Sequence, residues 1–334
     1  MPDKQVIMDV RHLTKWFPIK RGLALKTVGN VKAVDDVSFQ VYEGETLGLV
    51  GESGCGKSLT SLSITGLLGP KVRVAAGEAI FEGRDIFKLS PKEMRQLRGG
   101  KISMIFQEPM TALNPLFTVG NQMVEMMLPH MKITKKEALK RSVELLTDMG
   151  IERPEQVVKS YPFELSGGML QRVMIAMSLS CNPKILIADE PTTALDVTIQ
   201  AQILKLMNEL KHKYDTSIIL ITHNLGVVAQ ICDRVAVMYF GRIMETAPVK
   251  RLFEQPLHPY TKGLFLCIPK LDQDEDFLST IPGMVPSLTE KTEGCAFAPR
   301  CPRCTDRCRR EEPELVEVEE GHFCRCWGVL EDKA

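Results

Sequence analysis

The chain has 334 residues, of which 44% are hydrophobic and 25% charged, and this ordinary globular composition argues against a collagen-like, coiled-coil or largely disordered protein. Lysine and arginine together number 42, as do aspartate and glutamate, so the chain lacks the overall positive charge typical of proteins built mainly to bind DNA or RNA. Its length exceeds what one hydrophobic core usually supports, so we expect two lobes or a core domain with an appendage.

No stretch approaches the roughly 18 consecutive apolar residues of a membrane-spanning helix. The first ten residues carry charges at Asp3, Lys4 and Asp9 and contain no apolar segment of the kind found in secretory signals. We therefore predict a chain that does not cross a membrane by itself, is not secreted and works in the cytoplasm.

Residues 6–243 alternate short apolar runs with longer amphipathic segments, which is typical of an α/β protein with a mostly parallel sheet. Alternating polarity in residues 37–42 predicts an antiparallel β subdomain beside that sheet. The candidate strands of the buried parallel sheet are residues 46–50, 102–106, 185–188, 217–221 and 235–238.

A helical subdomain is predicted at about residues 115–182, because the apolar residues of the segment 135–149 recur at helical spacing. Those residues are Ala138, Val143, Leu145, Leu146 and Met149. Prolines interrupt the pattern after residue 256, which predicts a cassette domain at 1–256 and a C-terminal extension at 257–334.

A phosphate-binding loop is predicted at Gly51-Glu52-Ser53-Gly54-Cys55-Gly56-Lys57-Ser58, which matches the P-loop pattern. The apolar strand at 46–50 precedes it, and an apolar-periodic segment at 59–68, predicted to be helical, follows it. The glycines let backbone amides converge on phosphate oxygens, Lys57 reaches the β- and γ-phosphates, and the Ser58 hydroxyl can bind Mg²⁺. This strand, loop and helix predict binding of a nucleotide such as ATP.

A second acidic element follows the apolar run at 185–188, where Asp189 and Glu190 stand at the end of a predicted strand. Asp189 is placed to hold Mg²⁺ through water, and Glu190 to act as the general base for an attacking water. An apolar run that ends in Asp-Glu is common, but its combination with the P-loop favours a catalytic role.

The residues Leu165-Ser166-Gly167-Gly168-Met169-Leu170-Gln171-Arg172 closely resemble the signature of ATP-binding cassette (ABC) proteins. Ser166 is a natural N-cap, and the predicted helix 169–179 directs its dipole at any phosphate bound at its start. The resemblance implies a P-loop NTPase fold of the ABC type, in which two cassettes enclose two ATP molecules. Ser166 and Gly168 of one chain would then contact the nucleotide bound by the other.

The same resemblance assigns roles to two further residues and one loop. Gln107 resembles the loop glutamine that senses Mg²⁺ and contacts the membrane subunit, and His223 the switch histidine at the γ-phosphate. Thr193-Ala194-Leu195-Asp196 looks like the loop that crosses the dimer interface. Asn224 stands where the wider superfamily usually has aspartate, a departure that we expect to matter little.

An aromatic residue stacks on adenine in this family, and Phe17 falls at that place, with Trp16 as its close competitor. The predicted catalytic residues are Glu190, His223, Gln107 and Lys57, and the predicted Mg²⁺ ligands are Ser58, Gln107 and Asp189. The predicted nucleotide contacts are Phe17, Gly51, Ser53, Gly54, Cys55, Gly56, Lys57, Ser58, Leu59, Ser166, Gly168 and Asp196.

Three segments narrow the resemblance to the ATP-binding subunits of dipeptide and oligopeptide importers, namely residues 106–115, 161–164 and 258–261. The resemblance covers essentially the whole chain and implies ATP hydrolysis that powers peptide import. Its implied partners are a second ATPase subunit (a paralogue or a second copy), two transmembrane permease subunits and, indirectly, an extracytoplasmic substrate-binding protein, without nucleic acid. The implied location is the cytoplasmic face of the cell membrane, with peripheral attachment.

Six of the ten cysteines lie between Cys295 and Cys326 in the extension, and their spacing permits two kinds of metal site. A Zn²⁺ site would use Cys301 and Cys304 with Cys324 and Cys326. The importer family's tail pattern instead matches Cys295, Cys301, Cys308 and Cys326, a set that resembles that of members with a [4Fe–4S] cluster. We favour the cluster, with unliganded thiols, zinc or disulfides as the alternatives.

The alternative function is that of a soluble cassette ATPase acting on nucleic acid or in translation, with the cysteines as a zinc-type module. Chromosome-type cassettes insert a long coiled coil between P-loop and signature, and translation-type chains carry two cassettes. Neither feature occurs in this sequence.

Overall fold

The computed structural model describes residues 5–21, 26–69, 74–107, 112–193, 195–267, 280–286 and 293–332. The chain forms two compact units, each assembled from segments that are distant in the sequence. Unit 1 comprises Met1–Gln5, Tyr42–Thr46 and Lys88–Ile221, and unit 2 comprises Val6–Val41, Leu47–Phe87 and Thr222–Ala334. The P-loop and the cysteine-rich extension therefore belong to the same unit.

Unit 1 contains the parallel strands β6 (Ile102–Ile105), β7 (Ile185–Asp189) and β8 (Ser217–Thr222), in which β7 pairs with both of the others. Every residue of β7 and β8 is buried, which explains why these strands are nearly continuous runs of branched apolar residues. The structure confirms these three predicted strands, although β6 ends one residue earlier than predicted.

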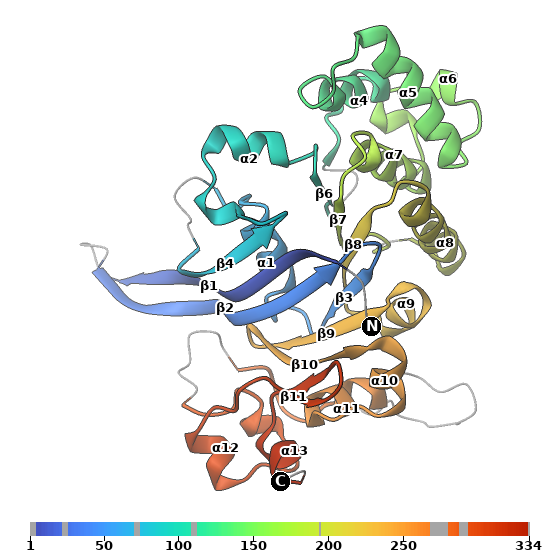
Figure 1. Cartoon of the computed structure of the whole chain (residues 1–334). Helices are drawn as coiled ribbons and strands as arrows, with labels where there is room; N and C mark the ends of the chain where they lie inside the picture. The colour runs from blue at the N-terminus through green and yellow to red at the C-terminus, as the bar shows by residue number, and fades with distance from the viewer. Residues whose placement is uncertain are drawn as a thin grey trace. The chain divides into compact units, whose positions relative to one another are not determined.

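Six α-helices lie among the described residues of unit 1. They are α2 (Pro91–Leu97), α4 (Val119–Met127), α5 (Lys135–Asp148), α6 (Pro154–Val157), α7 (Gly167–Leu179) and α8 (Val197–Lys213). In Figure 1, α4, α5 and α6 form one helical group, coloured green. A capping box of Thr134 and Glu137 begins α5. This helix buries Ser142, whereas Val143, one of the apolar residues of the predicted pattern, is only partly buried. The buried Ser142 hydroxyl is satisfied because it donates a hydrogen bond to the Ala138 carbonyl at 2.9 Å.

One sheet of unit 2 has the strand order β2-β1-β4-β5, and its pairs β1–β4 and β4–β5 are antiparallel, in accordance with the predicted β subdomain. Its strands are β1 (Val6–Arg21), β2 (Lys26–Tyr42), β4 (Ala76–Phe81) and β5 (Arg84–Asp85). In the second sheet, β3 (Thr46–Val50) pairs in parallel with β9 (Arg234–Tyr239).

The C-terminal extension adds strands to this second sheet. β10 (Arg242–Pro248) lies antiparallel beside β9 (Figure 1), and its other edge pairs with β12 (His322–Cys324), which pairs in turn with β11 (Val316–Glu319).

The helices of unit 2 are α1 (Lys57–Ile64), α9 (Leu225–Ile231), α10 (Val249–Glu254), α11 (Pro259–Leu266), α12 (Asp306–Arg310) and α13 (Trp327–Glu331). The extension is therefore more regular than its prolines suggested.

Helix α1 is shorter than the predicted segment 59–68. It ends at Ile64 because Gly66 takes a positive φ of 63°, and the Leu67 N–H donates a hydrogen bond to the Leu62 carbonyl at 2.9 Å. This is a Schellman C-cap, a geometry that glycine adopts without strain. No helix in the described ranges is long and apolar enough to cross a membrane.

A buried carboxylate joins the extension to β10. Glu245 and His322 are both buried, and His322 Nε2 lies 2.7 Å from Glu245 Oε1. The same carboxylate accepts hydrogen bonds from the backbone N–H groups of Leu257 and His258 at 2.7 and 2.9 Å. Burial opposes ionisation of Glu245, but these hydrogen bonds outweigh it and lower the pKa of the group.

We expect Glu245→Ala to lower the free energy of unfolding by about 3 kcal/mol at pH 7, because it leaves His322 and two backbone donors buried without an acceptor. Since the folded-state pKa lies below the ordinary 4.5, this stabilisation is present above pH 4.5 and is lost as the pH falls through the folded value. Urea unfolding should show the difference from wild type shrinking in acid. Lys250→Ala, which removes an exposed ion pair with Glu254, should cost less than about 1 kcal/mol.

Candidate functional site

The phosphate-binding loop of unit 2 connects β3 to α1 through backbone that glycine alone tolerates well. Gly54 and Gly56 have φ values of 78° and 106°. A Cβ atom on Gly56 would lie 2.5 Å from the Ala33 carbonyl oxygen, and one on Gly51 2.1 Å from the Met238 carbonyl oxygen. No atom of the described residues lies within 4 Å of the corresponding position on Gly54, so a Cβ there would meet no clash with them.

Lys57, the first residue of α1, is held over this loop. Its ammonium donates hydrogen bonds to the carbonyl oxygens of Gly51 and Glu52 at 2.8 and 3.0 Å, and the side chain is buried. Cys55 is also buried, and this burial raises the pKa of its thiol, so it is a neutral packing group rather than a nucleophile. The loop thus keeps one buried cation at the start of a helix, an arrangement that suits phosphate oxygens.

The predicted catalytic carboxylate stands in unit 1 at the end of β7. Asp189 is buried, and Glu190 follows with a positive φ of 45°, a conformation that non-glycine residues adopt rarely. Glu190 Oε2 accepts hydrogen bonds from Gln107 Nε2 and from Thr193 Oγ1, each at 3.0 Å. The structure therefore brings two predicted catalytic residues together and adds Thr193, which the sequence placed in the dimer-interface loop and not beside the catalytic carboxylate.

The signature segment begins α7 as predicted. The Ser166 hydroxyl accepts a hydrogen bond from the Met169 N–H at 3.4 Å, and a Cβ on Gly167 would meet none of the described residues within 4 Å. Gln171 is buried in this apolar helix, and its side-chain amide donates to the carbonyl oxygen of Pro191, next to Glu190. Sequence reasoning missed this link between the signature helix and the catalytic turn, although a lone glutamine among apolar helix residues was a usable signal.

Two predicted site residues, His223 and Asp196, lie at the starts of helices α9 and α8. His223 is exposed and follows β8 directly, while the Asn224 side chain caps α9 by accepting from the N–H groups of Gly226 and Val227 at 2.9 and 3.3 Å. Asn224, which stands where aspartate is usual in the superfamily, is therefore still a good N-cap. Asp196 caps α8 through the Ile199 N–H at 2.9 Å. Ala194 and residues 108–111, which contributed to the resemblance, lie outside the described residues.

The two aromatic candidates for adenine stacking differ in their contacts. The Trp16 indole N–H donates to Asp35 Oδ1 at 3.0 Å, and Lys32 lies over its ring. Phe17 follows it in β1, so it projects from the opposite face, where it is half-buried with the Lys15 ammonium 4.9 Å from its ring centre. Trp16 is thus engaged in the fold, which leaves Phe17 as the better candidate.

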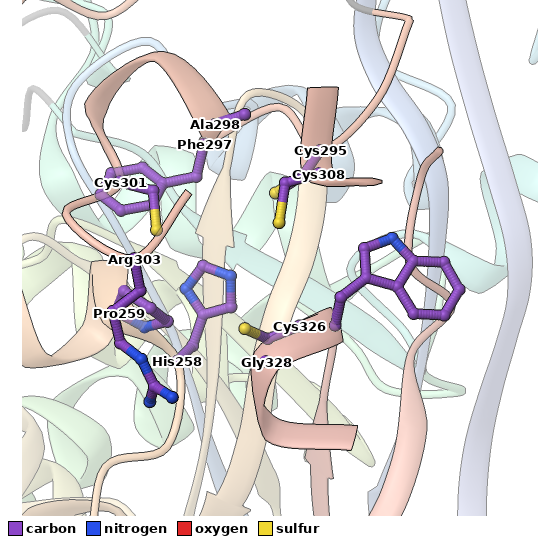
Figure 2. A pocket seen from close by; sticks show the side chains of 11 residues that line it. His258, Pro259, Cys295, Phe297, Ala298, Cys301, Arg303, Cys308, Cys326 and Gly328 are labelled. Atoms are coloured by element: carbon purple, nitrogen blue, oxygen red, sulfur yellow. The ribbon is translucent and has the colours of Figure 1, made fainter. Parts of the chain in front are cut away.

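Four cysteines line one pocket in the extension (Figure 2), and they are the set that the tail pattern predicted: Cys295, Cys301, Cys308 and Cys326. Their sulfur atoms point toward a common space in Figure 2, whereas Cys304 and Cys324 do not line it. Burial raises the pKa of Cys295 to about 12 and also raises those of Cys301 and Cys326. Within the described ranges, however, no three His, Cys, Asp or Glu side chains lie close enough together to hold a metal ion.

The predicted site residues are distributed over both units. Unit 2 holds Phe17, the loop from Gly51 to Leu59 and His223, and unit 1 holds Gln107, Ser166, Gly168, Asp189, Glu190 and Asp196. The loop and Lys57 can bind a phosphate chain, and the oriented Glu190 carboxylate can accept a proton from water.

Comparison with known proteins identifies two matching family models. Residues 34–193 match the ABC transporter family, and residues 244–308 match the oligopeptide/dipeptide transporter C-terminal region. The oligopeptide transport ATP-binding protein AppD of Bacillus subtilis is 52% identical over 91% of this chain and 93% of its own length. The dipeptide transport ATP-binding protein DppD of the same organism is 54% identical over 90% of each chain.

A solved structure with a similar fold is that of the ATP-binding cassette MJ0796 in a dimeric post-hydrolysis state bound to ADP and Pi. It is 27% identical, with a TM-score of 0.63 over 72% of this chain and 98% of that chain. The structure of cbiO1 from Clostridium perfringens, part of the transporter complex cbiONQ, has a TM-score of 0.61 at 28% identity, over 76% of this chain and 92% of that one.

The glycines of the loop provide a test of its backbone. Gly54→Ala should lower the free energy of unfolding by about 1 kcal/mol, the cost of a positive φ without a clash. Gly56→Ala carries the same strain plus a contact of 2.5 Å with fixed backbone, and should cost about 3 kcal/mol or more. Thermal unfolding of both variants measures the difference, and equal effects would contradict this loop conformation.

Proposed function

Because the chain belongs to the family of ATP-binding subunits of oligopeptide and dipeptide ABC transporters, we propose that it hydrolyses ATP to power the import of such peptides through partner membrane subunits. The named relatives are transport proteins and give no support to the alternative of a nucleic-acid or translation ATPase. The observation that carries the ATPase proposal most directly is the Glu190 carboxylate, which Gln107 and Thr193 orient at the end of β7.

The proposed reaction is in-line attack of water on the γ-phosphate of ATP, with release of ADP and phosphate. Glu190 orients the water and accepts its proton, while Lys57 and His223 stabilise the charge that develops on the γ-phosphoryl oxygens. Ser58 and Gln107 would hold Mg²⁺ directly and Asp189 through water, and the bound ion would supply positive charge that offsets the negative charge of the phosphates.

We further propose that the chain pairs with a second ATPase subunit, either a paralogue or a second copy. Ser166, which caps α7, and the adjoining Gly168 would then contact the nucleotide of the partner, and Asp196 would lie at the dimer interface. The surroundings of Gly167 and Gly168 support this, because among the described residues only an Ile199 methyl, at 3.5 Å from a Cβ on Gly168, comes within 4 Å of either position. MJ0796, whose cassette is similar to this one, forms a dimer with ADP and Pi bound.

An exposed apolar surface in unit 1 supports docking to membrane subunits. Leu116 is 79% and Phe163 69% exposed, and Phe117 and Tyr161 are also exposed. The segments carrying them lie together because the Val119 N–H donates to the Ser160 carbonyl at 2.9 Å. We propose that two permease subunits contact this surface, which would place the chain on the cytoplasmic face of the membrane. A substrate-binding protein would deliver peptide on the other side.

We also propose that the cysteine pocket holds a [4Fe–4S] cluster. The four thiols of the tail pattern line this pocket, and no carboxylate is among its lining residues. Four cysteine thiolates are the usual ligands of a [4Fe–4S] cluster. The Zn²⁺ alternative would need Cys304 and Cys324, which do not line the pocket. A cluster would hold together a segment rich in prolines and charges, so its role would be structural.

The catalytic proposal predicts that Glu190→Gln retains ATP binding while hydrolysis falls by at least about 100-fold, because the amide cannot accept the proton of water. ATP should then trap a dimer, which size-exclusion chromatography detects. Glu209→Gln, which alters an exposed carboxylate on α8, is the matched control and should hydrolyse ATP at the wild-type rate. Wild-type activity of Glu190→Gln would contradict the assignment of the base.

The cluster proposal predicts that anaerobically purified protein shows the visible absorption of an iron–sulfur cluster and contains about four iron atoms per chain. Cys308→Ser should lose both signals, whereas Cys304→Ser should keep them, because its side chain does not line the pocket. Zinc in place of iron, or equal loss in the two variants, would contradict the proposed ligand set.

A further inference from the structure

The C-terminal extension reaches into the phosphate-binding loop through one arginine. Arg300 ends the short turn η3 (Ala298–Arg300) and is separated from Glu52, the second residue of the loop, by 248 positions in the sequence. Its guanidinium makes a bidentate ion pair with the Glu52 carboxylate, with Nη1–Oε2 at 2.7 Å and Nη2–Oε1 at 3.1 Å. The Arg300 side chain is only 4% exposed, so water screens this pair weakly.

Arg300 is itself held firmly in place. Its Nε donates to the Pro282 carbonyl at 3.1 Å, and Nη2 donates to the Ile281 carbonyl at 3.3 Å. The Tyr239 hydroxyl lies 3.5 Å from Nη1, and the Tyr239 ring packs edge-on against Phe297, which precedes the turn. A guanidinium with these contacts acts as a fixed charge rather than a mobile surface cation.

Glu52 connects the C-terminal extension to the phosphate-binding loop. Its N–H donates to the Tyr260 hydroxyl at 2.9 Å, its carboxylate binds Arg300, and its carbonyl oxygen accepts from Lys57 at 3.0 Å. Tyr260 and Arg300 both come from residues 257–334, so the extension fixes two of the three polar groups of Glu52. The third group holds the lysine that we propose binds the phosphates.

We propose that Arg300 is a positioning residue for ATP binding: it neutralises and anchors Glu52 so that the loop presents Lys57 to a polyanionic phosphate chain. Without Arg300, the Glu52 carboxylate would remain as an uncompensated negative charge in the loop and would repel the triphosphate. The C-terminal extension thereby controls nucleotide affinity within its own chain. This inference rests on the proposed function only in taking ATP as the ligand of the loop.

The test compares four proteins: wild type, Arg300→Gln, Glu52→Gln/Arg300→Gln and the control Arg307→Gln. Arg307 lies in the same extension and also pairs with carboxylates, those of Glu311 and Glu331, and its described polar and ring contacts are all with residues of the extension. Isothermal titration calorimetry with a non-hydrolysable ATP analogue and Mg²⁺ gives the dissociation constant, and thermal unfolding shows that each variant is folded.

We expect Arg300→Gln to weaken binding about tenfold and the double variant to recover to within about threefold of wild type, because it removes the repelling charge as well. Arg307→Gln should bind as wild type does. A purely structural role would make the double variant at least as weak as the single one, and that result, or unchanged binding by Arg300→Gln, overturns the inference.

If Arg300→Gln does not fold, Arg300→Lys serves in its place, since it keeps the charge but loses the bidentate geometry. It should bind about threefold more weakly, and unchanged binding overturns the inference. Wild-type protein that fails to bind the analogue at all would instead refute the proposed function, so the two failures are distinguishable.

Discussion

The backbone of residues 51–56 is the constraint on which the proposed chemistry depends. Glycines at positive φ turn the chain between β3 and α1, and the resulting carbonyl oxygens of Gly51 and Glu52 receive the Lys57 ammonium. Because fixed backbone crowds Gly51 and Gly56, the loop has little freedom to collapse. The lysine is therefore placed by the fold before any ligand arrives, which lowers the ordering cost of binding.

Residues from segments distant in the sequence hold both the phosphate-binding loop and the turn that follows Glu190. Arg300 and Tyr260 hold Glu52 in unit 2, and Gln171 ties the signature helix to the turn after Glu190 in unit 1. The turn that carries Arg300 also contributes Ala298 to the lining of the cysteine pocket, and Cys301 follows it directly. Filling of that pocket would thus act on the same short segment that anchors the phosphate-binding loop.

Local patterns predicted the elements well, because each depends on neighbouring residues. The buried strands, the cap at Ser166 and the start of α5 all follow from apolar runs and capping residues, whereas the predicted end of α1 was wrong because Gly66 was read as helix interior. The resemblance supplied Gln107, and the acidic end of an apolar run, together with the P-loop, supplied Glu190. Neither could supply their hydrogen bond, or the pair of Arg300 with Glu52, because such contacts depend on tertiary packing between segments far apart in sequence.

The most direct test of the account is a crystal structure of the protein with Mg²⁺ and a non-hydrolysable ATP analogue. We expect the Lys57 ammonium to leave the Gly51 and Glu52 carbonyl oxygens and to bind β- and γ-phosphate oxygens instead. Ser58 should bind the metal, and the ion pair of Arg300 with Glu52 should remain intact. Nucleotide bound with Lys57 and Ser58 remote from every phosphoryl oxygen would contradict it.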